Sequence, residues 1–189
     1  MKNKLVLVSG YVAAGKTAFS HKLAQELNIP CFNYDAIDET ICDFLGSEMV
    51  ETHDEYDKES QEMAFCLMLH IIERLFIANN ACILEGSFEL EEINVIKKLL
   101  DKYNYECLLF ILKGDPKVMF DRYVKRDKSG ERHWIHAPAY EDWIINVMPT
   151  TRGLEKSEIK LKIAVDTTSF EKVDYNDLIV SANEFITMS

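Results

Sequence analysis

The stretch from Gly10 to Thr17, which reads GYVAAGKT, constrains the fold of this chain more than any other feature. It matches the pattern G-x-x-x-x-G-K-[ST] and directly follows an apolar run from Leu5 to Val8. Glycines at these positions let the backbone curl so that successive N–H groups face one anion, and a following helix adds the positive end of its dipole. The sequence therefore predicts a phosphate-binding loop between a buried strand and a helix.

Each part of this loop has an expected partner on a bound nucleotide. Lys16 is expected to reach the terminal phosphates and to take part in catalysis, and Thr17 is expected to bind a magnesium ion. The residues expected to bind the nucleotide are Gly10, Ala13, Ala14, Gly15, Lys16 and Thr17 in the loop, together with Arg126 from a later helix.

The composition limits the partners of the chain. Its 21 basic and 32 acidic side chains give a formal net charge of -11, which disfavours long nucleic acid as a partner but allows a local cationic pocket for a small phosphate. No apolar run approaches the roughly 20 residues that span a bilayer. The five cysteines are scattered through apolar runs without a C-x-x-C pair, as is typical of buried thiols in a reducing compartment. We expect a cytoplasmic protein with no membrane partner, and its oligomeric state is left open.

Apolar runs and helical patterns alternate along the rest of the chain. The expected strands are 5–9, 31–34, 81–84, 106–112 and 159–165. The expected helices are 15–27, 35–45, 58–78, 89–103, one that starts at 115–116, 139–147 and 175–186. The helix over 58–78 has too many apolar residues for one narrow stripe, so it is expected to be heavily buried. This alternation predicts a parallel α/β sheet within a single domain that covers residues 1–189.

Two carboxylates are candidates for chemistry beside the loop. Ligands of open α/β sheets bind outside the carboxyl ends of the strands, and Asp35 follows the second expected strand whereas Glu85 follows the third. Either could accept the proton of a substrate hydroxyl or hold a metal-bound water, and Glu85 could instead bind a substrate hydroxyl. Asp38, one turn after Asp35, is a substitute. The structural alternative makes Asp35 a helix cap and Glu85 a turn residue.

Arg122 and Arg126 are four residues apart on one expected helix face. Like charges at this spacing cost a few tenths of a kcal/mol unless an anion lies between them, and a phosphoryl group in transfer is such an anion. The hypothesis therefore places both arginines in catalysis. The alternative is that they stabilise the carboxyl end of the helix or pair with Asp121 and Asp127.

The polar and basic segment from 127 to 138 is interpreted as a lid loop. Arg132 in this segment is expected to act in catalysis with Arg122 and Arg126. His133 and His136 have no third metal ligand nearby, so a hydrogen bond to substrate or nucleotide, or plain exposure, is favoured over metal binding.

Taken with these residues, the chain resembles the P-loop kinases, in particular the AAA-type ATP-binding small-molecule kinases, which are related to chloramphenicol phosphotransferase and the zeta toxins. The resemblance is carried by the loop, by FNYDAI at 32–37, by ILEGSF at 83–88 and by GERHWIH at 130–136. It implies a P-loop NTPase three-layer α/β sandwich with five parallel strands in the order 2-3-1-4-5 and a helical lid at about 122–140. It also implies Asp35 as general base, a substrate side over the helical segment at about 35–79, and an adenine site around 166–168.

The resulting hypothesis is an ATP- and Mg²⁺-dependent kinase that transfers a phosphoryl group to a hydroxyl of a small molecule. Asp35 serves as base and metal contact, Glu85 binds substrate, and the arginines neutralise charge as the lid closes. The acidic stretch 46–60 favours a neutral or cationic acceptor such as a nucleoside, a sugar or an aminoglycoside-like metabolite. The alternative is a nucleotide-binding regulatory or toxin-like ATPase that acts through a protein partner, against which the basic lid argues. The acceptor, and the choice between ATP and GTP, stay open.

Overall fold

The computed structural model describes residues 3–45, 53–129, 138–148 and 153–188. Five strands form one sheet: β1 (Lys4–Gly10), β2 (Cys31–Asn33), β3 (Cys82–Glu85), β4 (Glu106–Lys113) and β5 (Leu161–Asp166). All four pairings are parallel, and the order is β2-β3-β1-β4-β5. The expected order of strands is therefore confirmed. In this register Val8 lies opposite Glu85 on one side and Phe110 on the other, which brings Glu85 beside the start of the loop.

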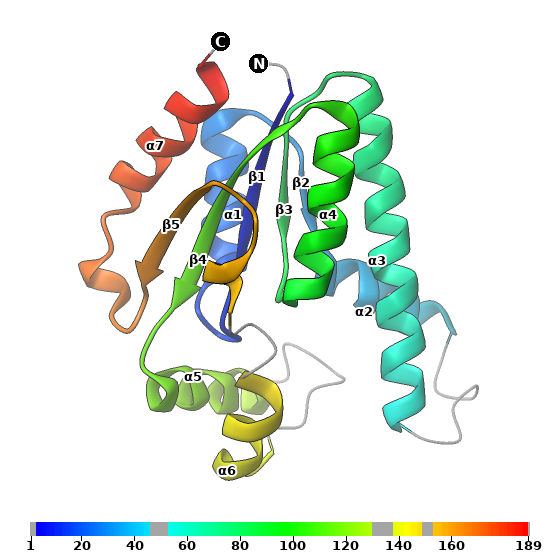
Figure 1. Cartoon of the computed structure of the whole chain (residues 1–189). Helices are drawn as coiled ribbons and strands as arrows, with labels where there is room; N and C mark the ends of the chain where they lie inside the picture. The colour runs from blue at the N-terminus through cyan, green and yellow to red at the C-terminus, as the bar shows by residue number, and fades with distance from the viewer. Residues whose placement is uncertain (1–2, 46–52, 130–137, 149–152, 189) are drawn as a thin grey trace.

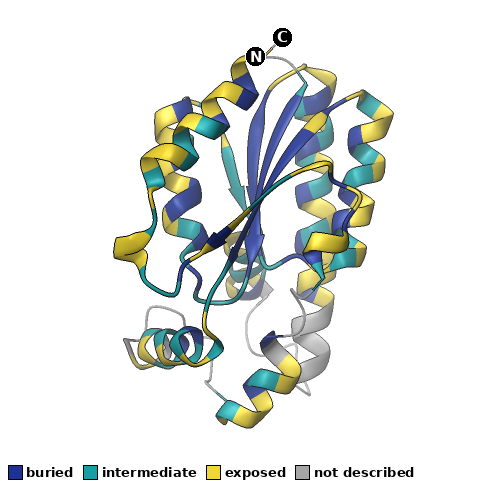
Figure 2. Ribbon diagram, turned by 60° about the vertical axis from the view of Figure 1, so that its left-hand side comes forward, coloured by how far each residue is buried: buried dark blue, intermediate teal, exposed yellow. Residues whose placement is uncertain are grey.

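Helices cover both faces of the sheet, as Figure 1 shows. On one face lie α1 (Lys16–Leu27) and α7 (Tyr175–Thr187), and on the other α3 (His53–Ile77) and α4 (Leu90–Tyr103). Alternate residues of β1 serve the two layers: Val6 and Val8 join the core under α1 and α7, whereas Leu5 and Leu7 join the core under α3 and α4. A central strand buried on both faces explains the continuous apolar run before the loop. Figure 2 shows this burial along the central strands.

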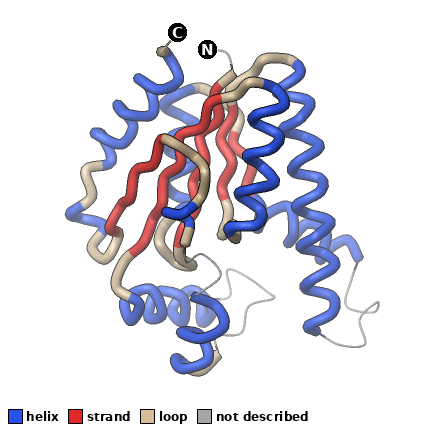
Figure 3. Tube along the Cα trace, viewed as in Figure 1, coloured by secondary structure: helices blue, strands red, loops and turns tan. Residues whose placement is uncertain are grey.

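The remaining helices lie toward the carboxyl ends of the strands, in the lower half of Figure 3. They are α2 (Tyr34–Leu45), α5 (Pro116–Ser129) and the short α6 (Tyr140–Asp142), which continues as a π-helical turn over Trp143–Val147. Trp143 is fully buried and packs edge-on against Phe120, at 5.7 Å between ring centroids, so it fastens this turn to α5. The expectation of a helical segment over 139–147 is therefore confirmed, with a π-helical turn as its second half. Single turns of 3₁₀ helix occur at Leu154–Lys156 and Phe170–Lys172.

Helix α3 is less buried than expected. Its inward stripe consists of Ala64, Met68, Ile72 and Phe76, while Met63 and Leu67 stay 47% and 45% exposed. Among the described side chains of this helix, one face packs against the core and the opposite face is exposed. The large number of apolar residues therefore did not indicate that every face of the helix is buried.

Two further findings concern the exposure of the cysteines and the character of the helices. Cys66 is exposed on α3, which corrects the expectation that all five cysteines are buried. Among the described residues, the helices lack the length and apolar character that crossing a membrane requires.

Candidate functional site

The loop between β1 and α1 adopts a tight turn that its glycines make possible. Gly10 has a φ of +136°, and a Cβ there would lie 1.9 Å from the backbone oxygen of Leu112 on β4. Gly15 has a φ of +85° directly before α1. Ala13 has a φ of +62°, in the left-handed region that side chains with a Cβ adopt at a cost. The loop is therefore curled by its own backbone conformation, and it stores some backbone strain at Ala13.

Lys16 is 6% exposed and folds back across this loop. Its Nζ donates to the backbone oxygens of Gly10, at 3.3 Å, and Tyr11, at 3.0 Å. A third bond, of 2.9 Å, reaches Oγ of Ser87 just beyond β3. Each of these oxygens is neutral, so a phosphate that enters the loop would offer the ammonium group a stronger, charged acceptor.

A buried carboxylate lies beside the first turn of α1. Glu85 has no exposed surface, and its Oε1 accepts a hydrogen bond from Oγ1 of Thr17 at 3.4 Å. Its Oε2 accepts from the side-chain amide of Asn33, which also lies 3.5 Å from the Thr17 hydroxyl. A buried carboxylate is costly unless it is hydrogen-bonded, so these contacts explain how Glu85 is tolerated at the end of a central strand.

The donor set around Thr17 suits a magnesium ion by its chemistry. Mg²⁺ prefers oxygen ligands and is commonly bound by one or two carboxylates and retained waters. The Thr17 hydroxyl and the Glu85 carboxylate supply such oxygens next to the loop. Among the described residues, no group of three or more His, Cys, Asp or Glu side chains could hold a metal ion alone. Water or a phosphate would therefore supply further ligands to a metal bound here.

Asp35 lies in the first turn of α2, partly buried, two residues beyond Asn33. The preceding residue, Tyr34, points toward α3 and β3, with its hydroxyl donating to the backbone oxygen of Gln61 at 3.1 Å and its ring stacked on Phe88. Burial and the surrounding carboxylates raise the pKa of Tyr34 above its ordinary value. Tyr34 therefore anchors the start of α2, and Asp35 is carried at the carboxyl edge of the sheet, where it was expected.

Arg122 is engaged by the segment that follows β5. Its guanidinium donates to the backbone oxygens of Thr167, at 2.7 Å, and Thr168, at 2.9 Å, and lies 3.8 Å from the ring centroid of Phe170. The same ring lies close to Gly15, because a Cβ added to that glycine would meet it at 2.9 Å. Arg122, Phe170 and the end of the loop between β1 and α1 are thus in one cluster.

Of the other basic residues expected in the site, the structure describes only Arg126. The Arg126 guanidinium lies 5.9 Å from the ring centroid of Tyr123 on α5. Arg132, His133 and His136 lie outside the described residues, as do most residues of the expected lid loop. The structure therefore gathers Lys16, Thr17 and Glu85 in one place, and their catalytic and binding roles stay predictions.

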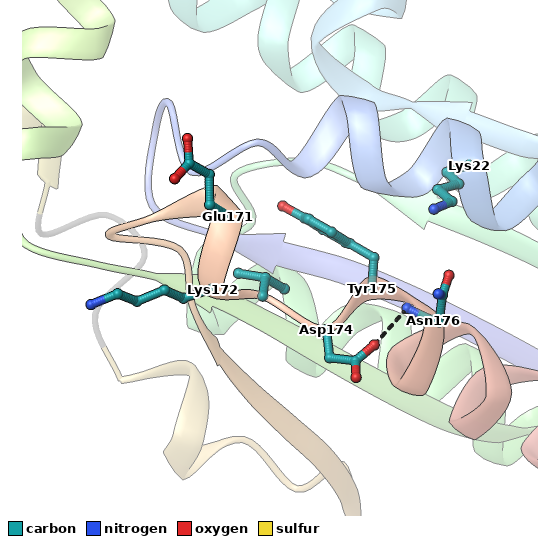
Figure 4. A pocket seen from close by; sticks show the side chains of 7 residues that line it. Lys22, Glu171, Lys172, Asp174, Tyr175 and Asn176 are labelled. Carbon is teal, nitrogen blue, oxygen red and sulfur yellow. Dashed lines mark hydrogen bonds between the residues drawn. The ribbon is translucent and has the colours of Figure 1, made fainter.

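A polar cavity of about 430 Å³ lies on the outer side of this cluster. It is lined by Lys22 from α1 and by residues 171–176, and Figure 4 shows Tyr175 lying between Lys22 and Glu171. Asp174 caps α7 by accepting from the backbone N–H groups of Asn176 and Asp177, at 3.1 Å each. Burial raises the pKa of Tyr175, and the nearby Arg122 opposes this effect. The cavity adjoins the Phe170 side of the site, away from Glu85.

Three residues of the site were not identified from the sequence. Asn33 ends β2, two residues before Asp35, and Ser87 lies two residues beyond Glu85 at the end of β3. Their position at the carboxyl edge of the sheet was therefore an available signal. Phe170 lies in a polar segment whose pattern predicts only a loop, and no signal in the sequence singles it out.

Comparison with known proteins supports the fold and leaves the family open. No family model and no curated protein matches the chain. A solved structure of a protein from Chloroflexus aurantiacus matches with a TM-score of 0.81 at 21% identity, over 98% of this chain and 97% of that one. That protein is named a kinase by inference only. A sugar kinase from Janibacter sp. matches with a TM-score of 0.62 at 19% identity, over 99% and 96% of the two chains. Shikimate kinase from Bacteroides thetaiotaomicron matches with a TM-score of 0.59 at 18% identity, over 97% and 98%.

These similarities show that the chain has the α/β fold of P-loop kinases. They do not show a relationship to chloramphenicol phosphotransferase or the zeta toxins, so that part of the resemblance stays a prediction.

Proposed function

We propose that the protein is a kinase that uses Mg²⁺ and ATP to phosphorylate a hydroxyl group of a small molecule. The observation that carries this proposal is the contact between the Thr17 hydroxyl and the buried Glu85 carboxylate. Thr17 directly follows Lys16 at the end of the curled loop, which we interpret as phosphate-binding. An oxygen site for a metal next to a phosphate-binding lysine is the arrangement that phosphoryl transfer needs. The small-molecule kinases with the same fold agree with it.

The loop would hold the phosphates. Its backbone N–H groups and the start of α1 face the anion, and Lys16 exchanges its three neutral oxygen acceptors for the terminal phosphates. Bound Mg²⁺ would neutralise charge that develops on the phosphoryl oxygens. Thr17 would bind this ion directly, and Glu85 would bind it or one of its waters.

The acceptor hydroxyl would lie between the loop and α2. Asp35 would take its proton as the general base, since it lies at the carboxyl edge on the helix that follows β2. Glu85 was expected to bind the substrate, but its contact with Thr17 favours the metal side, and Asp35 is therefore the better candidate for base.

The charges on the acceptor side favour a neutral or cationic substrate. The described side chains of α2, and of α3 from Glu59 to Glu73, include no lysine or arginine. Their acidic members are Asp35, Asp38, Glu39, Asp43, Glu59 and Glu62, together with Glu73, whose charge is paired with Lys102 of α4. An anionic acceptor would meet repulsion along this surface, whereas a sugar, a nucleoside or an amine would not.

Arg122 and Phe170 would form the wall against which the nucleobase lies. Both flank the start of α1, and the guanidinium and the ring offer flat surfaces for stacking. In this position Arg122 would act on the nucleotide base side, and Arg126 and Arg132 would remain the candidates to neutralise the transferred phosphoryl group.

The test is phosphate transfer by the purified protein. ATP labelled on the γ-phosphate and Mg²⁺ would be incubated with panels of sugars, nucleosides and aminoglycosides, and the products separated by chromatography. The proposal expects one panel to yield a labelled product. Hydrolysis at the same rate with and without every panel would instead favour the regulatory ATPase.

A further inference from the structure

Asn33, the last residue of β2, makes contacts in two directions. Its Nδ2 donates to Oε2 of Glu85 on β3 and lies 3.5 Å from Oγ1 of Thr17 on α1. Its Oδ1 accepts a 2.7 Å hydrogen bond from the backbone N–H of Ala36 in the first turn of α2. One side chain thus touches α1, β3 and α2, and its partner on β3 is 52 positions away in the sequence.

The partners of Asn33 fix the orientation of its amide. A backbone N–H can only donate, so the atom that faces Ala36 must be the oxygen. The nitrogen then faces the carboxylate of Glu85, which can accept. The two ends of the amide therefore have different tasks: the oxygen caps the start of α2, and the nitrogen holds Glu85.

A neutral donor is well suited to the surroundings of Glu85. Cys31 of β2 is close enough to this carboxylate to interact with it electrostatically. The Lys16 ammonium is bonded to the loop and to Ser87. A carboxylate in place of Asn33 would add a second acid beside Glu85, whereas the amide adds no charge and still donates.

We propose that Asn33 is a positioning residue of the site: its amide nitrogen aims Glu85 at Thr17, while its oxygen fixes the start of the helix that carries Asp35. The role of Asn33 in phosphoryl transfer rests on the proposed function, but its hydrogen bond to Glu85 does not. Asn33 acts through Glu85 and through α2, so it links the metal side of the site to the acceptor side.

The substitution Asn33→Asp separates the two tasks. An aspartate oxygen still accepts from the N–H of Ala36, so the cap on α2 is retained. The donor to Glu85 is lost whenever the introduced carboxyl is ionised. When that carboxyl is protonated, its O–H donates to Glu85 as the amide did. Two carboxylates that share one site cannot both ionise easily, so one of them holds its proton to a raised pKa.

The first measurement is the melting temperature between pH 5 and pH 8, with EDTA present and no nucleotide. The shared proton raises a carboxyl pKa in the folded state above its unfolded value of about 4. The corresponding stability is therefore complete below that unfolded value and is lost as the pH rises through the folded pKa. Relative to the wild type, N33D is expected to lose at least about 3 °C across this range.

Two controls accompany this measurement. The double variant N33D/E85Q removes the partner carboxyl, so its melting temperature should not show the decline. Asn183 is exposed on α7, and N183D adds the same charge away from the site, so it should follow the wild type at every pH. A melting temperature of N33D that runs parallel to the wild type would overturn the inference and leave Asn33 a helix cap.

The second measurement is the Mg²⁺-dependent affinity for ATP, determined by calorimetry. A residue that orients a metal contact typically changes metal affinity by about 10–100-fold. Asn33→Ser keeps a cap for α2 but does not reach Glu85, so it should show this loss at both pH 6 and pH 8. N33D should show it at pH 8 and much less at pH 6. Wild-type affinity in both variants would also overturn the inference, whereas a chain that binds Mg²⁺ and ATP but phosphorylates no acceptor would count against the kinase alone.

Discussion

The hydroxyl oxygen of Thr17 lies 3.4 Å from Oε1 of Glu85. Thr17 belongs to the first turn of α1 and Glu85 to the last position of β3, so the contact joins the predicted phosphate-binding loop to the neighbouring strand. Glu85 is fully buried and is held by a donor from a third element, β2. A carboxylate that is buried at such a cost, beside an oxygen that binds metal in loops of this type, is a candidate for a role in metal binding.

Glu85→Gln should weaken the Mg²⁺-dependent part of ATP binding by about 10–100-fold, because the carboxylate charge beside the metal is lost while the side chain keeps its shape. Calorimetry with and without Mg²⁺ would measure the effect. Glu91→Gln, at an exposed position of α4, is the matched control and should bind like the wild type. Equal Mg²⁺ dependence in both variants would exclude Glu85 from the metal site.

Lys16→Ala should weaken ATP binding by about 10–100-fold, since a hydrogen bond to a charged group is worth roughly 1.5–3 kcal/mol. Three oxygens that accept from Lys16 in this structure are neutral, so a bound phosphate would be a stronger acceptor. The same calorimetric titration with Lys98→Ala, an exposed lysine on α4, provides the control. An unchanged affinity in the Lys16 variant would refute the phosphate-binding loop.

Ala13→Gly should stabilise the fold by less than about 1 kcal/mol, because glycine relieves the left-handed backbone conformation but also gains freedom in the unfolded chain. Ala13 has a φ of +62°, whereas its neighbour Ala14 is fully buried and has no positive φ. Ala14→Gly should therefore destabilise. Thermal unfolding of the two variants beside the wild type decides the question, and a loss of stability in both would show that Ala13 carries no strain.

The loop, the strands and the edge of the sheet could be predicted from the sequence, because they depend on local patterns. A glycine-rich turn after an apolar run and the register of a parallel sheet together place Glu85 near the loop. The hydrogen bond from Asn33 to Glu85 could not be predicted, because these residues are 52 positions apart and only the tertiary fold brings them together.

Helix α3 and Phe170 illustrate the limits of such patterns. The apolar residues of α3 indicated burial, but periodicity does not show which of them find partners, and Met63 and Leu67 remain partly exposed. Phe170 reaches Gly15 through a turn after β5, a contact between the two ends of the chain. The position of the lid residue Arg132 lies outside the described residues and stays a prediction.

Phe170→Ala should weaken ATP binding about tenfold while leaving the binding of tripolyphosphate unchanged, because only ATP has a base to stack on the ring. The ring is 40% exposed beside the Arg122 guanidinium, so part of its surface is open to a ligand. Competition titrations with the two ligands measure the difference. Tighter ATP binding in the variant would show that the ring occupies the position of the base.

Asp35→Asn should reduce phosphate transfer by about 10²–10⁴-fold with ATP affinity unchanged, because loss of a general base affects the chemical step and not the hold on the phosphates. Asp35 and Asp38 lie three residues apart on α2, so Asp38→Asn tests the nearest substitute, and the exposed Asp43 of the same helix supplies the control. Single-turnover transfer to the acceptor found by the panel assay separates the three variants. If the Asp38 variant alone lost transfer, the base would be Asp38, and if none did, the proton would leave the acceptor without help from α2.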